Sequence, residues 1–129
     1  MSITIIQRAF GSPDVLEPVE TNRPTASDLA PGEVLVAVAA AGVNPIDVMT
    51  RTGGGMAAAG VITLPFTPGW DLAGRVEATG PEATGLTAGQ RVLGLARFPK
   101  EGAAYAEYAI VPAEDLISTP ENLTDEQAG

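Results

Sequence analysis

Glycine and proline recur along the whole chain, and their spacing constrains the fold more than any other feature. The 129 residues include 15 glycines and 11 prolines, which separate apolar runs too short to form long helices. A chain of this length is enough for one compact domain around one core, and it is too short for two. The sequence therefore predicts a single, mainly β domain with short helices.

Short apolar runs mark the expected strands. They lie at Ile3–Ile6, Val15–Val19, Glu33–Ala41, Trp70–Thr79, Arg91–Ala96, Ala103–Val111 and Leu116–Ser118. Both alternating sets of side chains in Glu33–Ala41 are apolar, so we expect this strand to be central and buried on both faces. Gly74 lies inside an expected strand, where glycine indicates a bulge or the close approach of another backbone segment.

Three connecting segments can also be interpreted. Asn44-Pro45 is expected to begin a short helix, because proline fits the first helical turn and Asp47 places negative charge near the positive end of the helix dipole. The polar, proline-rich segment Asn22–Gly32 is expected to be a loop. The glycine- and alanine-rich segment Thr52–Gly60 is expected to be a mobile loop.

The last residues contain a helix start. Thr124 and Gln127 form the T-x-x-Q pattern of a capping box, with Thr124 as the N-cap. The sequence then ends two residues later. This pattern favours a chain cut from a longer protein, and the alternative is a natural frayed tail that happens to contain T-x-x-Q.

Two residue types are missing from the composition, and their absence excludes several reaction classes. The chain has neither cysteine nor histidine. A Ser-His-Asp triad, a Cys-His dyad and a histidine-built zinc site are therefore impossible within these residues. Disulfides and thiolate metal sites are excluded as well.

Charge and hydropathy exclude further partners. Seven basic residues are scattered among sixteen acidic ones, for a formal net charge of −9, so no basic stripe is available to bind a nucleic-acid backbone. The longest apolar stretch, Val34–Val43, is about half of the roughly 20 residues that a membrane span requires. The N-terminus lacks the layout of a signal peptide. We expect a cytoplasmic protein with no nucleic-acid or membrane partner.

Several polar residues lie in apolar surroundings and are candidates for chemistry. They are Asn44, Asp47, Asp71, Tyr105, Glu107 and Tyr108. Asn44 and Asp47 could instead only cap the short helix, and Asp71 could be a strand-end residue whose carboxylate accepts backbone N–H groups. Tyr105 and Tyr108 are expected on opposite faces of one strand, so at least one belongs to the core or its rim. No two acids show a pattern that predicts a shared pocket.

The triple glycine Gly53–Gly55 invites comparison with phosphate-binding loops. A dinucleotide fingerprint needs G-x-G-x-x-G between a strand and a helix, and a P-loop needs G-x-x-x-x-G-K-[ST]. Neither pattern occurs, and Lys100, the sole lysine, is followed by Glu101 and Gly102. The sequence therefore predicts no nucleotide-binding fold in this chain.

A series of motifs resembles the signature series of the medium-chain dehydrogenases/reductases. In chain order they are Pro31–Val36, Ala41–Asp47, Arg51–Gly53, Leu64–Phe66 with Pro68–Gly74, Gly89–Val92, Gly102–Tyr108 and Pro120–Thr124. Each motif alone is only moderately specific, but the whole series in the right order is hard to produce by chance. The chain resembles the N-terminal, GroES-like catalytic domain of the zinc-independent, quinone oxidoreductase-like branch.

This resemblance implies a fold and a domain organisation. Residues 1–129 correspond to a GroES-like, partly open β-barrel with short helices, which forms the catalytic or substrate-side domain. In the family this domain packs against a Rossmann domain that binds NADPH. The C-terminal end of this chain is expected to begin the helix that leads to such a domain, which is absent from the sequence.

The resemblance also implies a site without zinc. Zinc-dependent members carry a cysteine ligand at the position of Asn44 and a histidine ligand at the position of Trp70, in a G-H-E version of Gly69-Trp70-Asp71. Asparagine and an indole cannot hold zinc. The four-cysteine structural zinc lobe is missing too. Hydride transfer without a metal is the implied reaction, with NADPH as the donor and a quinone or an activated double bond as the acceptor.

Site roles follow from the same resemblance. Asn44 is the first candidate, as a residue that binds the cofactor and orients the nicotinamide or the substrate, and Asp47 is a second candidate catalytic residue. Met49, Trp70 and Tyr105 are expected to shape an apolar substrate pocket, although Trp70 could equally belong to the core. Many relatives carry tyrosines where this chain has Met49 and Gly55, so the proton is expected from solvent or from outside the chain.

Two functions remain open. The first is the catalytic domain of an NADPH-dependent reductase, inactive on its own, which explains every motif. The second is a stand-alone GroES-like binding module or partner subunit without catalysis; a chaperonin-cofactor role is weaker, because a shared fold does not carry function. The expected partners are a small-molecule substrate and the Rossmann domain. An uncovered apolar face makes a homodimer conceivable.

Overall fold

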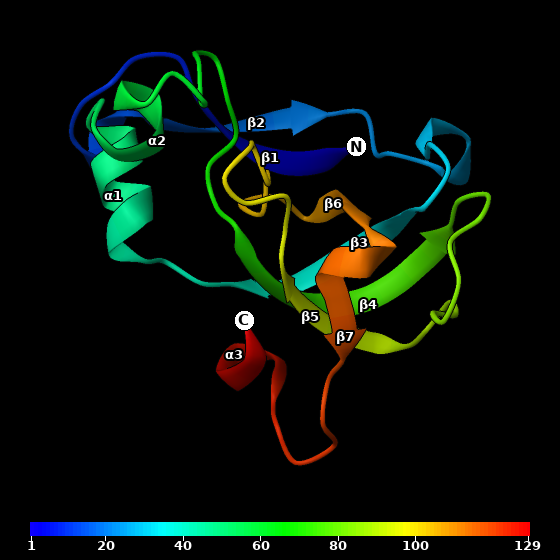
Figure 1. Cartoon of the computed structure of the whole chain (residues 1–129). Coiled ribbons are helices and arrows are strands. Elements are labelled where there is room, and N and C mark those ends of the chain that lie inside the picture. The colour runs from blue at the N-terminus through cyan, green and yellow to red at the C-terminus, as the bar shows by residue number, and fades with distance from the viewer.

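Seven strands and three short α-helices make up the domain (Figure 1). The computed structural model describes residues 1–129. The strands are β1 (Ser2–Gln7), β2 (Leu16–Thr21), β3 (Glu33–Ala41), β4 (Asp71–Thr79), β5 (Arg91–Leu95), β6 (Tyr108–Pro112) and β7 (Leu116–Ser118). The helices are α1 (Pro45–Arg51), α2 (Gly55–Ala58) and α3 (Asp125–Ala128), with 3-10 turns η1 (Pro13–Val15), η2 (Ala26–Asp28) and η3 (Ala113–Asp115). This confirms the expected mainly β fold.

The strands form two antiparallel sheets. One pairs β1 with β2, and the other has the strand order β6-β3-β4-β5-β7. Isolated bridges from Thr4 to Ala106 and from Gln7 to Phe66 join β1 to segments outside the named strands. Figure 1 shows the two-stranded sheet above the larger one, with α1 and α2 at one side. The arrangement is the partly open, GroES-like barrel that the sequence predicts.

Strand β3 has the predicted bounds and is paired on both sides, with β4 and with β6. Its first half is buried on both faces, because the neighbouring side chains Val34, Leu35 and Val36 are all buried. The prediction is wrong for the second half, where Ala37–Ala41 stay partly or largely exposed. Pairing with β6 stops at Ala37, so the rest of the strand lies on an open side of the sheet.

The core has two parts. Ten buried residues form the main cluster inside the larger sheet: Val34, Val36, Leu72, Val76, Val92, Ala96, Ala104, Ala109, Val111 and Leu116. A second cluster contains Ile62, Phe66 and Trp70, with Ile46 of α1 and Met56 of α2 packed against it. The two helices are therefore fixed to the barrel by apolar burial, which stabilises helices too short to persist alone.

The expected strand at Ala103–Val111 is wrong in its first half, because β6 begins only at Tyr108. Ala103 has a φ of 55°, and the N–H of Ala106 donates to the carbonyl of Ala104. The chain therefore turns here instead of extending. Tyr105 lies outside any strand, so the argument that placed it and Tyr108 on opposite strand faces does not hold.

Two expected loops contain short helices. Thr52–Gly60 holds α2, formed where alanine supplies helix propensity, and Asn22–Gly32 holds the 3-10 turn η2. Val15 ends η1 rather than starting β2. None of the α-helices has the length and the apolar character that a bilayer crossing requires.

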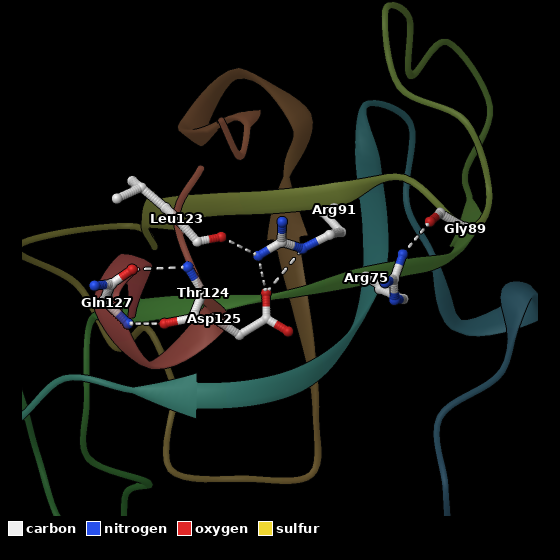
Figure 2. A network of polar contacts seen from close by, with 7 residues as sticks. All are labelled: Arg75, Gly89, Arg91, Leu123, Thr124, Asp125 and Gln127. Atoms are coloured by element: carbon white, nitrogen blue, oxygen red, sulfur yellow. Dashed lines mark hydrogen bonds and ion pairs between the residues drawn. The ribbon is translucent and has the colours of Figure 1, made fainter. Parts of the chain in front are cut away.

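The predicted helix start at the C-terminus is confirmed. Figure 2 shows Thr124 Oγ1 accepting from the N–H of Gln127 while the Gln127 side chain accepts from the N–H of Thr124. Arg91 of β5 holds this turn from the side, because its Nη2 donates to the carbonyl of Leu123 at 2.7 Å and to Asp125 Oδ1 at 2.9 Å. Helix α3 thereby packs against β3 and β4.

Gly74 marks the close backbone approach that the sequence predicts. A Cβ at this position would lie 2.0 Å from the carbonyl oxygen of Ala37 on β3, so Gly74→Ala must push the two central strands apart. We expect a loss of about 3 kcal/mol in the free energy of unfolding, measured by urea denaturation. Gly60→Ala is the control, because Gly60 has open space around it; its positive φ, which Gly74 lacks, should cost about 1 kcal/mol. A loss no larger than that of the control would contradict the account.

The Arg91 contacts predict a local effect on α3. Arg91→Gln removes the charge that holds Leu123 and Asp125, so the amides of Ala128 and Gly129 should exchange with solvent about 10-fold faster, as measured by hydrogen-exchange NMR. Arg75→Gln is the matched control, because Arg75 bonds only the carbonyl of Gly89 on the neighbouring turn (Figure 2). Equal changes in both variants would show that the contacts do not fix α3.

Candidate functional site

The candidate site begins where β3 ends and β4 begins. The two strands run antiparallel, with Ala41 opposite Leu72, so the residues that follow β3 lie beside the first residue of β4. Asn44 is the N-cap of α1, and Asp71 is the first residue of β4. The amide Nδ2 of Asn44 donates to Asp71 Oδ2 at 2.6 Å. A side-chain contact thus joins residues that are 27 positions apart.

Asp47 lies one helical turn inside α1 and faces the interior. Its Oδ2 accepts from the backbone N–H of Asn44 at 2.8 Å, which is a capping-box contact. The residue is only 5% exposed, and its Oδ1 has no hydrogen-bond partner. Burial raises the pKa of this carboxyl, the Asn44 N–H opposes that shift, and the charge of Asp71 adds to it.

Tyr105 stands over the turn before β4. A Cβ at Gly69 would lie 2.4 Å from the Tyr105 ring, so the ring packs directly on that glycine. The pKa of Tyr105 is raised to about 12, mainly by burial; the charges of Asp47 and Asp71 add to this shift, and the charge of Arg51 opposes it. The phenol therefore keeps its proton throughout the neutral range and is available as a hydrogen-bond donor.

The structure separates the three residues that were expected to shape a pocket. Trp70 is only 4% exposed, belongs to the second core cluster and donates from Nε1 to the carbonyl of Lys100 at 2.6 Å. Its core role is thus clear. Tyr105 lines two cavities, and Val43 lines both of them as well. Met49 is 52% exposed on α1 and lines neither of these cavities.

An apolar groove with a free volume of about 740 Å³ lies next to the Asn44 segment. It runs between β1 and the open half of β3, and its walls include Ile3, Ile5, Val38 and Tyr105. A smaller cavity of about 350 Å³ lies between α1 and Tyr105, with Asp47 and Arg51 on its wall. Both spaces meet at Val43 and Tyr105, which line both.

The other sequence candidates have structural roles. Glu107 Oε2 accepts from the N–H of Ile3 at 2.6 Å, so it fixes β1. The Tyr108 ring lies 4.3 Å from the guanidinium of Arg23. Asp71 is a strand-end residue, as one interpretation of the sequence predicted. Its carboxylate accepts from the side chain of Asn44 and not from the backbone N–H groups that this interpretation expected.

One feature of the site escaped the sequence analysis. Asp47 and Glu101 line one cavity, although no pattern predicted acids in a shared pocket. They are 54 positions apart, and only the fold brings them together. No group of three or more histidine, cysteine, aspartate or glutamate residues lies close enough to hold a metal ion.

The raised pKa of Asp47 predicts how stability changes with pH. Between the ordinary value of 3.8 and the higher value in the folded chain, the native state binds the Asp47 proton more tightly than the unfolded state does. Stability from this group is therefore present at low pH and is lost as pH rises through the folded pKa.

Asp47→Asn removes this titration. We expect the free energy of unfolding of the native chain, minus that of the variant, to fall as pH rises from about 3 toward neutrality. Urea denaturation at each pH measures both values. A difference that stays constant, or that increases with pH, would contradict the burial of this carboxyl.

Comparisons with known proteins agree with the fold. The family model of the alcohol dehydrogenase GroES-like domain matches residues 30–121. Quinone oxidoreductase of Sus scrofa is 34% identical over 119 residues, and the match covers 92% of this chain and 33% of the relative. A zinc-type alcohol dehydrogenase-like protein of Schizosaccharomyces pombe is 36% identical over 110 residues, covering 82% of this chain and 32% of the relative.

Solved structures show the same likeness. The quinone oxidoreductase from Coxiella burnetii has a TM-score of 0.88 at 34% identity, covering 98% of this chain and 39% of that one. A mycobacterial protein complexed with NADPH has a TM-score of 0.78 at 32% identity, covering 97% and 34%. The chain spans about a third of the length of the curated relatives that it matches. It belongs to the GroES-like domain family of the alcohol dehydrogenases, within the medium-chain dehydrogenases/reductases.

Proposed function

We propose that this chain is the substrate-side domain of a zinc-independent, NADPH-dependent reductase that acts on quinones or activated double bonds. The observation that carries the proposal is the hydrogen bond from Asn44 to Asp71. It holds a neutral amide in one orientation where zinc-dependent members of the family carry a metal ligand. An amide presented in this way suits the recognition of a carboxamide or a carbonyl oxygen.

Zinc independence is also supported at the second zinc-ligand position of the family, where this chain has Trp70. Trp70 occupies the place of the histidine ligand. An indole nitrogen is only a hydrogen-bond donor and offers no lone pair to a cation. In this chain it donates to the carbonyl of Lys100. The buried ring also fills the second core cluster. The residue at this position thus contributes to the core and offers no metal ligand.

NADPH use is supported by the similar proteins and by the Asn44 amide, which suits the carboxamide group of the nicotinamide. Among the similar structures, one mycobacterial protein is complexed with NADPH. In our proposal Asn44 would hold the carboxamide group of the nicotinamide. The reduced nicotinamide ring supplies the hydride when the cofactor is bound. The rest of the cofactor would bind a Rossmann domain outside these residues. The full-length protein would then contain about one more domain, as its relatives' greater lengths suggest.

The chain's own residues would supply orientation, a dry surface and a hydrogen-bond donor. Asn44 fixes the angle at which the reacting groups meet, an effect that removes the entropy cost of finding that geometry. Tyr105 keeps its proton because its pKa lies near 12, so it can donate a hydrogen bond to a developing oxyanion. Exposed Val43 and Met49 beside Asn44 would be covered by the Rossmann domain and would exclude water.

A stand-alone binding module is the second candidate. The apolar groove between β1 and β3 favours it, because about 390 Å³ of the groove is wide enough for a water molecule and its walls are mostly apolar, which is enough room for a small molecule. A module of this kind would bind a quinone without consuming NADPH.

Substitution of Asn44 tests the reductase proposal. In the full-length protein, Asn44→Ser keeps a good helix cap but loses the amide that orients the reacting groups. We expect kcat/KM for the oxidation of NADPH by a benzoquinone or an enone to fall about 100-fold. Absorbance at the reduced-nicotinamide band measures the rate.

Two controls make the result specific. Asn22→Ser changes an asparagine in a surface loop outside the site and should leave kcat/KM within about twofold. Treatment with a strong chelator should leave the activity of the native protein unchanged. Loss of activity on chelation would refute the zinc-independent mechanism, and quinone binding without NADPH oxidation would favour the binding module.

A further inference from the structure

A small internal cavity lies behind the candidate site. It is enclosed by α1, by the segment that leads into β4 and by the loop at Glu101 and Gly102. Its free volume is about 220 Å³, and the part wide enough for a water molecule holds about one. Ile62, Phe66 and Trp70 form apolar walls, and all three are buried.

The remaining walls carry oxygen atoms. Asp47, Thr50 and Thr67 are buried, and together with Glu101 they line the cavity. Glu101 is solvent-exposed, so it lies where the cavity meets the surface. An apolar pocket of this size would stay dry, whereas one with several hydrogen-bonding groups holds a water molecule.

Asp47, which lines this cavity and the neighbouring one at Tyr105, has one oxygen atom that needs a partner. Asp47 Oδ2 is occupied by the N–H of Asn44, but Oδ1 is buried and accepts no hydrogen bond from the chain. Buried polar atoms in folded proteins are almost always paired, with a protein group or with ordered water. The Asp47 side chain is 95% inaccessible, so bulk solvent cannot supply that partner directly.

We propose that the cavity is a built binding site for one long-lived water molecule, which donates to Asp47 Oδ1 and connects that carboxyl to solvent at Glu101. The water is chosen over a cation because only two acids reach the cavity and one of them is at its mouth. The cluster lacks the third carboxylate, histidine or thiolate that a metal site in this chain would need.

This water gives Asp47 a route for proton exchange. When Asp47 ionises, the O–H bond at Oδ1 breaks and the proton passes to the water oxygen; the water releases one of its own protons toward the Glu101 carboxylate, which exchanges it with solvent. The charge of Asp71 acts on Asp47, and Arg51 and Tyr105 line the neighbouring cavity together with Asp47. Burial raises the pKa of both Asp47 and Glu101, so both carboxyls hold protons more tightly than usual.

The water site does not depend on the proposed function, but its use does. If the domain acts as a reductase, the route lets Asp47 exchange its proton with solvent during turnover, and Asp47 acts as a positioning residue that holds the backbone N–H of Asn44. A failed activity assay would remove this use and leave the water site in place. The two claims are therefore tested separately.

Oxygen-17 magnetic relaxation dispersion tests the site, because it counts long-lived internal water molecules without interference from hydroxyl protons. Asp47→Leu removes the acceptor, so this variant of the 129-residue chain should show one long-lived water fewer than the native chain. In Asp47→Asn the amide oxygen can accept from the N–H of Asn44 and the NH2 group can donate to the water, so this variant should keep the water. Asp28→Leu is the matched control, because Asp28 makes the same capping contact with the N–H of Thr25 and lines no described cavity.

Thr67→Ile fills the cavity from another wall and provides a second variant if Asp47→Leu does not fold, with the same loss expected. An equal number of long-lived waters in the native chain and in both of these variants would overturn the proposal. A shift of the Asp47 carboxyl ¹³C resonance when sodium is replaced by choline would also overturn the proposal, because such a shift would show that a cation fills the cavity.

Discussion

The antiparallel pairing of β3 with β4 is the constraint on which the candidate site depends. Ala41, the last residue of β3, lies opposite Leu72, so the residues after β3 and those before β4 must meet at the same edge of the sheet. Asn44 and Asp71 are brought together by this register. Gly74 allows the pairing, because any larger residue would collide with the carbonyl of Ala37 on the facing strand.

The site that results places two acidic side chains around one asparagine. Two carboxylates lie close enough to Asn44 to share its amide and its N–H, and one of them is buried with a free oxygen. Such a pair disfavours a second negative charge. An amide and a phenol that keeps its proton can both donate hydrogen bonds to a developing oxyanion, and the raised pKa of Asp47 disfavours negative charge beside them.

Local signals in the sequence were enough to predict much of the fold. Apolar alternation gave the bounds of β3, and the T-x-x-Q pattern located α3, because both depend on residues close in the chain. Tyr105 was misplaced because the positive φ of Ala103 has no signal in an alanine side chain. The Asn44–Asp71 bond and the cavity shared by Asp47 and Glu101 join residues far apart in the chain, so no local pattern could show them. The family resemblance pointed to Asn44, but it could not show what holds the amide in place.

A crystal structure of the full-length protein with a bound reduced nicotinamide cofactor tests the central claim most directly. The account predicts the nicotinamide carboxamide at hydrogen-bond distance, about 3 Å, from the Asn44 side chain, with the Asn44–Asp71 bond kept and no metal ion beside Trp70. A nicotinamide ring bound away from Asn44, or a metal ion held at that position, would contradict it.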